Sequence, residues 1–205
     1  MPEPDSYLTL AGPAEVEIPK IKGSRFIGVA RPAGSIEEAK EAVEAVRKQF
    51  YDARHHCFAY RLAPAGDVFR AADDGEPAGS AGQPILAQLA EADLVDAVAV
   101  VVRYFGGTKL GVGGLVRAYG AAAKAVLESA VVEEVVLRTS LAIQFAYDDT
   151  SPAMRLLDQF DVSVIDTVYG SDTTLHLAVR NSQVDAFSRH FVEQLAGRGT
   201  IRLEP

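Results

Sequence analysis

The chain has 205 residues, 48% of them hydrophobic and 23% charged, as is ordinary for a globular protein. Lys and Arg number 20 against 28 Asp and Glu, and the resulting net charge of −8 excludes an overall basic nucleic-acid-binding domain. Cys57 is the only cysteine, so an internal disulfide is excluded, and no stretch approaches the ~20 apolar residues needed to cross a bilayer. We expect a cytoplasmic protein without a membrane segment.

The first fourteen residues are polar and rich in proline, and we expect a short N-terminal arm over residues 1–14. A first domain is expected over residues 15–137. Ser35, followed three residues later by Glu38, forms a capping box and predicts a helix start at this point. The predicted strands are 16–30 (two strands meeting near Gly23), 57–62, 68–71, 97–102 and 131–136, and the predicted helices are 36–50, 85–92 and the segment from Leu115 to Leu127.

The second half, residues 138–205, has the order strand, helix, strand, strand, helix, strand. Ser151 before Pro152 is typical of a helix start, and Ser182 is the expected cap of the second helix. The order predicts a ferredoxin-like domain. Its strands are expected at 139–147, 162–169, 173–179 and 200–203, and its helices at 151–160 and 182–195.

A glycine-rich loop separates the apolar strand at 97–102 from the helix that follows. A helix start offers unpaired N–H groups and the positive end of a dipole, which favour an anion. Val112 and Val116 stand where the P-loop and dinucleotide motifs need a Lys and a Gly, so neither motif is present. We predict a general anion or RNA site here, with a tight packing turn as the alternative. Its residues are Arg103, Gly106, Gly107, Lys109, Gly111, Gly113, Gly114 and Arg117.

A second glycine-framed helix start, with Ser80 and Gly82, is predicted to join this site. Lys22 and Arg25 flank a turn and are candidates for a basic rim, the alternative being a solvated hairpin tip. No metal site is expected, because the CxxC and HExxH patterns are absent, and no cofactor is expected.

An alternative function comes from the acidic loop that precedes Ser80. His55 with Asp73, Asp74 and Glu76 could transfer protons or hold Mg²⁺ in a small enzyme acting on a phosphorylated or anionic metabolite. The structural explanation is a solvated turn whose aspartates cap local N–H groups, and a histidine that bonds a loop backbone.

Several long motifs, in this order along the chain, resemble the YigZ/IMPACT family over about residues 15–130. They are Lys22–Phe26, Ala53–Arg61, Asp73–Gly82 and Arg103–Tyr119. Ser80 stands where Thr is more usual in the family and keeps the hydroxyl.

The resemblance implies an α+β fold with two domains. The first is a ribosomal-protein-like α/β two-layer domain, as also seen in elongation factor G, and the second is ferredoxin-like, as in bacterial YigZ-type members. Eukaryotic members carry an additional RWD domain, and their role is not transferred to this chain.

The resemblance also implies a role related to RNA or the ribosome, and it supplies no catalytic residues. We therefore expect a non-enzymatic binding protein whose partner is RNA, the ribosome or a translation factor, or another phosphate-bearing ligand. A module that binds proteins through the ferredoxin-like sheet is a third hypothesis. The oligomeric state stays open.

Overall fold

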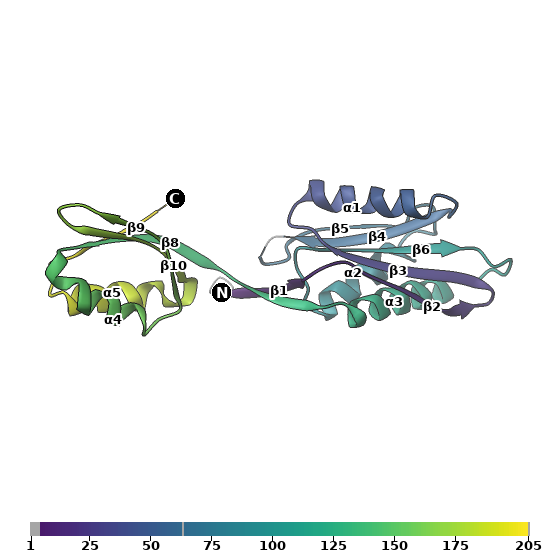
Figure 1. Ribbon diagram of the computed structural model, residues 1–205. Helices are drawn as coiled ribbons and strands as arrows, with labels where there is room; N and C mark the ends of the chain where they lie inside the picture. The colour runs from purple at the N-terminus through teal and green to yellow at the C-terminus, as the bar shows by residue number, and fades with distance from the viewer. Residues whose placement is uncertain (1–4, 63, 205) are drawn as a thin grey trace. The chain divides into compact units, whose positions relative to one another are not determined.

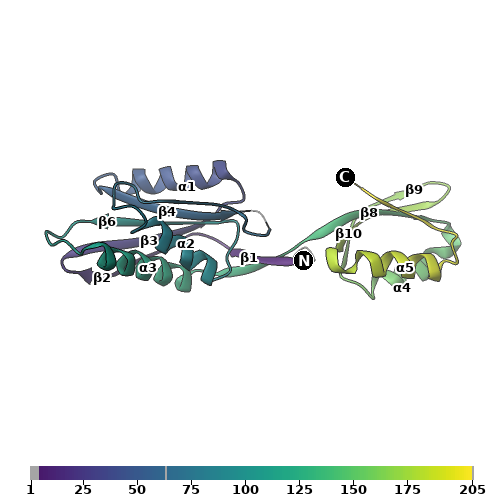
Figure 2. The ribbon, with the colours of Figure 1, turned by 180° about the vertical axis from the view of Figure 1, so that it is seen from behind.

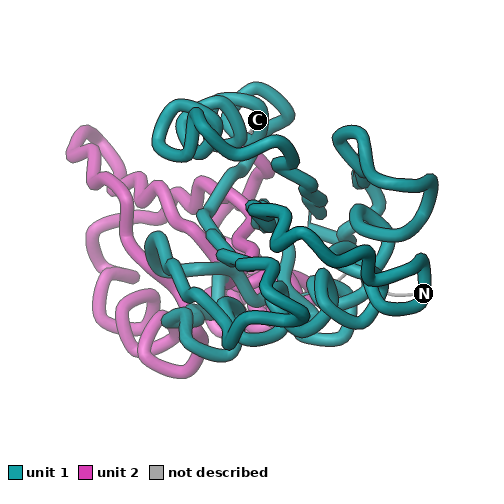
Figure 3. The backbone as a smooth tube through the Cα atoms, turned by 90° about the vertical axis from the view of Figure 1, so that its right-hand side faces the viewer, with its two compact units in different colours: residues 1–135 teal, residues 136–205 magenta. Residues whose placement is uncertain are grey.

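The computed structural model describes residues 5–62 and 64–204. The chain divides into two compact units, Met1–Val135 and Val136–Pro205, which Figure 3 colours teal and magenta. Each unit has its own hydrophobic core. Within the described residues, no helix combines the length and the apolar character needed to cross a membrane.

The first unit is built on an antiparallel sheet whose central strand is β6 (Ala97–Tyr104) (Figure 1). Residues Ala97–Arg103 of β6 are all buried, as predicted for an apolar strand covered on both faces. The strand order is β2-β3-β6-β4-β5, with β2 at Ala14–Ile21, β3 at Ser24–Pro32, β4 at His55–Leu62 and β5 at Val68–Ala72.

Helices cover both faces of this sheet. Helix α1 (Ile36–Gln49) lies on one face, and α2 (Gly82–Glu91) and α3 (Val112–Ser129) lie side by side on the other (Figures 1 and 2). Two hydrophobic clusters fill the two interfaces. The unit therefore has three layers instead of the expected two. Successive side chains of β6 point to opposite faces of the sheet, and both sets are apolar, so each face is covered by helices.

The predicted N-terminal arm is wrong for the residues that the structure describes. Ser6–Leu10 forms strand β1, which pairs with β7 (Val132–Val136), and the side chain of Leu10 is buried in the larger cluster. Residues 1–4 lie outside the described part of the chain. The alternating pattern of Tyr7-Leu8-Thr9-Leu10 is typical of a strand, but the prolines on both sides of this segment favoured an irregular arm in the sequence analysis.

The second unit has the predicted order β8-α4-β9-β10-α5-β11 and a ferredoxin-like sheet with strand order β11-β8-β10-β9. Both helices begin near their expected caps but not at them: Asp149 precedes α4 and Gln183 precedes α5, in place of Ser151 and Ser182. The elements are β8 (Arg138–Phe145), α4 (Thr150–Leu157), β9 (Val162–Tyr169), β10 (Thr173–Arg180), α5 (Val184–Gln194) and β11 (Thr200–Leu203).

Candidate functional site

The glycine-rich loop ends at the N-terminus of α3, which starts at Val112, three residues earlier than predicted. Gly111 is the N-cap residue, with φ at 74°, and no side chain caps this end of the helix. Gly111, Val112 and Gly113 are all exposed. The first N–H groups of α3 and the positive end of its dipole are therefore open to an anion from outside.

The β2–β3 turn holds the other end of this loop in place. Lys22 and Gly23 both have positive φ, as a two-residue hairpin turn requires. The turn lies directly against Gly106, where a Cβ would overlap the backbone of Gly23. The Gly106 N–H donates to Ser24 Oγ at 3.2 Å. Gly106 thus serves the close approach of two backbones, and its amide is not available to a ligand, contrary to its predicted role.

A cavity of about 350 Å³ lies between the acidic loop and the start of α3. Gly111 and Val112 form one side, Lys109 and Phe105 contribute side chains, and the pair Glu76 and Arg103 lines it as well. Gly107 is another of the predicted anion-binding residues. It is exposed in the same loop, and its φ is 87°.

Arg103 is not on the surface, contrary to its predicted role as a phosphate contact. It is 5% exposed, and its Nη1 donates to Glu76 Oε1. Tyr119 Oη donates to the same Glu76 oxygen at 2.8 Å. Burying a guanidinium costs free energy unless a carboxylate compensates it, so this pair is a fixed part of the fold. Arg103 therefore ties the acidic loop to the central strand.

The buried guanidinium of Arg103 keeps one unused donor. Its Nε has no hydrogen-bond partner among the described residues. The rings of Phe26 and Phe105 each lie with their centroid 5.6 Å from the guanidinium carbon, a cation–π distance. The guanidinium is therefore held between two aromatic rings, and its charge is balanced by the Glu76 carboxylate in the same cavity lining.

The carboxylate of Asp73 occupies the second predicted anion site, at the start of α2. Its carboxylate accepts the N–H groups of Gly79, Ala81 and Gly82 at 2.8 to 2.9 Å. Burial raises the pKa of this carboxyl, but the three backbone donors outweigh it and hold the pKa below its usual value. The start of α2 thus contains its own anion.

Ser80 and Gly82 are consequently corrected as ligand-binding residues. Ser80 is fully buried and its hydroxyl donates to the Pro77 carbonyl at 2.6 Å. The Gly82 amide is used by Asp73. The two glycine-framed helix starts do not form one site, because the protein fills one of them itself.

The residues of the enzyme alternative are engaged in structural contacts. Asp74 accepts from Arg47 Nη2 at 2.8 Å and from the His56 backbone N–H at 2.7 Å. His55 Nδ1 lies 2.9 Å from the Asp74 carbonyl oxygen rather than from its carboxylate. The cavity beside α3 is lined by Glu76 but not by His55, Asp73 or Asp74. Among the residues described, no group of three His, Cys, Asp or Glu could hold a metal ion.

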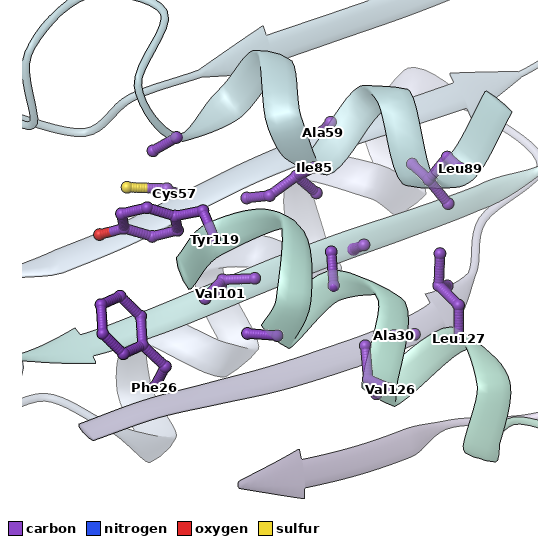
Figure 4. Close-up of a cluster of buried hydrophobic side chains, with 14 of the residues drawn as sticks. Phe26, Ala30, Cys57, Ala59, Ile85, Leu89, Val101, Tyr119, Val126 and Leu127 are labelled. Atoms are coloured by element: carbon purple, nitrogen blue, oxygen red, sulfur yellow. The ribbon is translucent and has the colours of Figure 1, made fainter. Parts of the chain in front are cut away.

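Cys57 and Tyr119 lie beneath the acidic loop, in the cluster between the sheet and α3 (Figure 4). Burial raises the pKa of the Cys57 thiol to about 12 and raises that of Tyr119 as well. Cys57 Sγ donates to the Asp73 carbonyl at 3.0 Å. A neutral, buried thiol is a poor nucleophile, so Cys57 is a structural residue here.

A second hollow, of about 300 Å³, carries the exposed cation Arg117. Lys22 from the β2–β3 turn lines it together with Leu110, which precedes α3, and Gly114, in the first turn of α3. Leu110 also lines the first cavity, so the two hollows adjoin. We name the exposed groups around both hollows, together with the half-buried Gly114, the α3 cationic surface. It comprises Lys22, Gly107, Lys109, Gly111, Gly113, Gly114 and Arg117.

Two other cations of the first unit have carboxylate partners. Arg25 donates twice to the Glu17 carboxylate at 2.9 Å. Lys124 lies 3.8 Å from Glu128 and lines a different hollow at the end of α2.

The sequence did not identify Tyr119 as a partner of the acidic loop. Its helical spacing indicates only a position in the core, whereas in the structure its hydroxyl donates to Glu76.

Comparisons with known proteins identify relatives over nearly the whole chain. Residues 22–127 match the Impact N-terminal domain family, and residues 143–198 match a domain of unknown function, DUF1949. The chain is 37% identical to the IMPACT family member YigZ of Escherichia coli K12, over 97% of both chains. It is 34% identical to the IMPACT family member YvyE of Bacillus subtilis, over 96% of this chain and 90% of the relative. A crystal structure of a hypothetical protein is 37% identical, covers 98% of each chain and has a TM-score of 0.67.

Proposed function

The chain belongs to the IMPACT family, and from this premise we propose that it is a cytoplasmic, non-enzymatic regulatory protein that binds RNA, free or in the ribosome. The α3 cationic surface is the binding site. The observation that supports the proposal is the uncapped, exposed start of α3 with Lys109, Lys22 and Arg117 around it. It contrasts with the start of α2, which Asp73 fills.

The charges of the site favour a phosphate backbone over a neutral ligand. The protein has a net charge of −8, so a local group of three cations stands out against an acidic molecule. Backbone N–H groups at a helix start and exposed Lys or Arg side chains are the groups that contact phosphates without reading the base. The buried Glu76 is neutralised by Arg103, so it does not repel the anion.

Binding of a labelled single-stranded oligouridine to the full chain tests the proposal. Three side-chain contacts to phosphates give a slope of about −2 in a plot of log affinity against log salt. Lys109→Ala and Arg117→Ala each weaken binding and make the slope shallower by about 0.7, because each variant loses one released counterion.

Lys40→Ala is the matched control, since this exposed lysine lies on α1, on the opposite face of the sheet. Its affinity and slope stay at the parent values. Salt-independent binding, or a slope that neither variant changes, would overturn the proposal. Sedimentation with purified ribosomes, measured for the same variants, shows whether the protein binds RNA as part of the ribosome.

A further inference from the structure

The cavity between the acidic loop and the start of α3 has an apolar part that a phosphate group does not need. Phe105 contributes its ring to the lining and is 53% exposed. Val112, the first residue of α3, lines the cavity and is exposed as well, and Pro77 lines it from the acidic loop. Exposed apolar side chains gathered around one hollow are typical of a ligand-binding groove. The cavity therefore suits a ligand with an apolar part beside its anionic one.

The ring of Phe105 is supported from one side and open on the other. The guanidinium carbon of Arg103 lies over this ring, 5.6 Å from its centroid. Arg103 is itself held by Glu76, so the support is a fixed part of the fold. Since one face of the ring lies against this buried group and half of the residue is exposed, the other face is available to a flat partner.

The polar part of the same cavity has donors for an anion. Lys109 is exposed in its lining, next to the uncapped N–H groups at the start of α3. Arg103, which lines the cavity and is nine-tenths buried, has an Nε without a hydrogen-bond partner in the described part of the chain. A buried donor without an acceptor costs free energy, and an oxygen of a bound ligand would supply the acceptor. This donor indicates a polar ligand independently of the helix start.

A nucleotide combines the two kinds of group that this cavity can bind. Its phosphate matches the lysine and the helix amides, and its base is a flat, mostly apolar ring that stacks on an aromatic side chain. The volume of about 350 Å³ is near the lower end of the range for small-molecule sites, so the cavity takes one nucleotide and leaves the rest of a strand outside.

We propose that Phe105 stacks on one unpaired base of a single-stranded RNA, while a neighbouring phosphate of the same strand binds Lys109 and the first amides of α3. The inference rests on the proposed function and adds to it the kind of RNA that the site takes. In a duplex the bases are already stacked on one another inside the helix, so a duplex offers phosphates to this surface but no base to the ring.

Titration of labelled oligouridine into full-length variants tests the stacking contact. Phe105→Leu keeps an apolar side chain but removes the flat ring, and it weakens binding by about tenfold, as for the loss of one stacked base. The loss is the same at every salt concentration, because no counterion is involved, so the slope stays at the parent value. Phe105→Tyr keeps the ring and binds within about twofold of the parent.

Phe69→Leu is the matched control, since Phe69 is an exposed phenylalanine of the same unit. It lies in the edge strand β5 opposite Arg61, which pairs with Ala97 at the start of β6, whereas Phe105 follows the end of β6. This variant binds oligouridine as the parent does.

Inorganic polyphosphate is the second probe, because it offers phosphates without bases. Phe105→Leu leaves the affinity for polyphosphate within about twofold of the parent value, whereas Lys109→Ala weakens the binding of both polyphosphate and oligouridine. A duplex RNA behaves like polyphosphate in these two variants. The melting temperature of each variant shows that it is folded.

The outcomes separate this inference from the proposed function. Parent affinity for oligouridine in Phe105→Leu, with the parent salt slope, would overturn the stacking contact alone, whereas salt-independent binding would overturn the phosphate site and with it both proposals. An equal loss of polyphosphate binding in Phe105→Leu would show that the ring only shapes the loop. Displacement of oligouridine by an equal concentration of uridine monophosphate would assign the cavity to a free nucleotide instead of a strand.

Discussion

At the residue scale, Asp73 decides which of two similar helix starts can take a ligand. Both starts follow glycine-rich loops, and the sequence places no cap residue directly before either helix. Asp73 lies eight and nine residues before Ala81 and Gly82, too far for a recognised capping pattern, but the loop returns its carboxylate to their amides. The carboxylate occupies the place that an outside anion would need.

Asp73→Asn is expected to destabilise the protein by about 1 kcal/mol at pH 7, as for a weakened helix cap. The folded-state pKa of Asp73 is lowered, so its stabilisation is present above the unfolded pKa of about 3.9 and is lost as the pH falls through the folded pKa. The difference in unfolding free energy between parent and variant therefore narrows below about pH 4. Urea unfolding at a series of pH values measures it.

Asp67→Asn serves as the control, because Asp67 is exposed and lies in the turn before β5. The free energy of unfolding of this variant at pH 7 stays within about 0.5 kcal/mol of the parent value, as for an exposed surface substitution. If the difference in unfolding free energy between the parent and Asp73→Asn stays constant down to pH 2, the carboxylate charge contributes nothing to the cap.

At the element scale, the strands and helices could be predicted well and the site only in part. The apolar run at 97–102 and the alternating 173–179 specify their strands by local pattern alone. Local pattern could not show that Arg103, in a run of valines, meets Glu76 from a loop 27 residues earlier. Such pairing depends on strand order, which the spacing of apolar residues does not contain. The hydrogen bond from the Gly82 N–H to the Asp73 carboxylate likewise depends on the folded path of the loop, which local pattern does not show.

The glycines of the loop before α3 and of the first turn of α3 are of two kinds, which substitution by alanine distinguishes. Gly106→Ala is expected to destabilise by about 1–3 kcal/mol, because the new Cβ would overlap the backbone of Gly23 and must push the turn away. Gly113→Ala is expected to stabilise by up to about 1 kcal/mol, because its Cβ meets only Arg117 Nη1, at 3.8 Å, and alanine is the better helix former.

Thermal or urea unfolding of the two variants checks this contrast. If Gly106→Ala were as stable as the parent, the backbone contact between the turn and the loop would not form in solution. The position of Lys22 beside α3 would then lose its support.

At the scale of the whole molecule, the two units have separate cores, and the α3 cationic surface belongs to the first unit alone. The cations and the free helix amides of that surface are all supplied by residues before the end of α3. Binding of a phosphate backbone should therefore not depend on the second unit.

Oligouridine binding is expected to respond to changes in the first unit and not to changes in the second. Arg117→Glu replaces a phosphate contact with a repulsive charge, so it strongly weakens oligouridine binding. Tyr169→Ala, which truncates a side chain of the second unit that is 72% exposed, leaves the affinity within about twofold of the parent value. Oligouridine is titrated into both full-length variants at the same salt concentration, and the melting temperature of each variant shows that it is folded.

The double variant Arg117→Glu with Tyr169→Ala checks the same point by additivity. If the second unit takes no part, the double variant binds oligouridine as Arg117→Glu alone does, since the effects of distant changes add in free energy. A loss of oligouridine binding in Tyr169→Ala at the parent melting temperature would mean that the second unit contributes to the site, and the independence argued from the separate cores would be wrong.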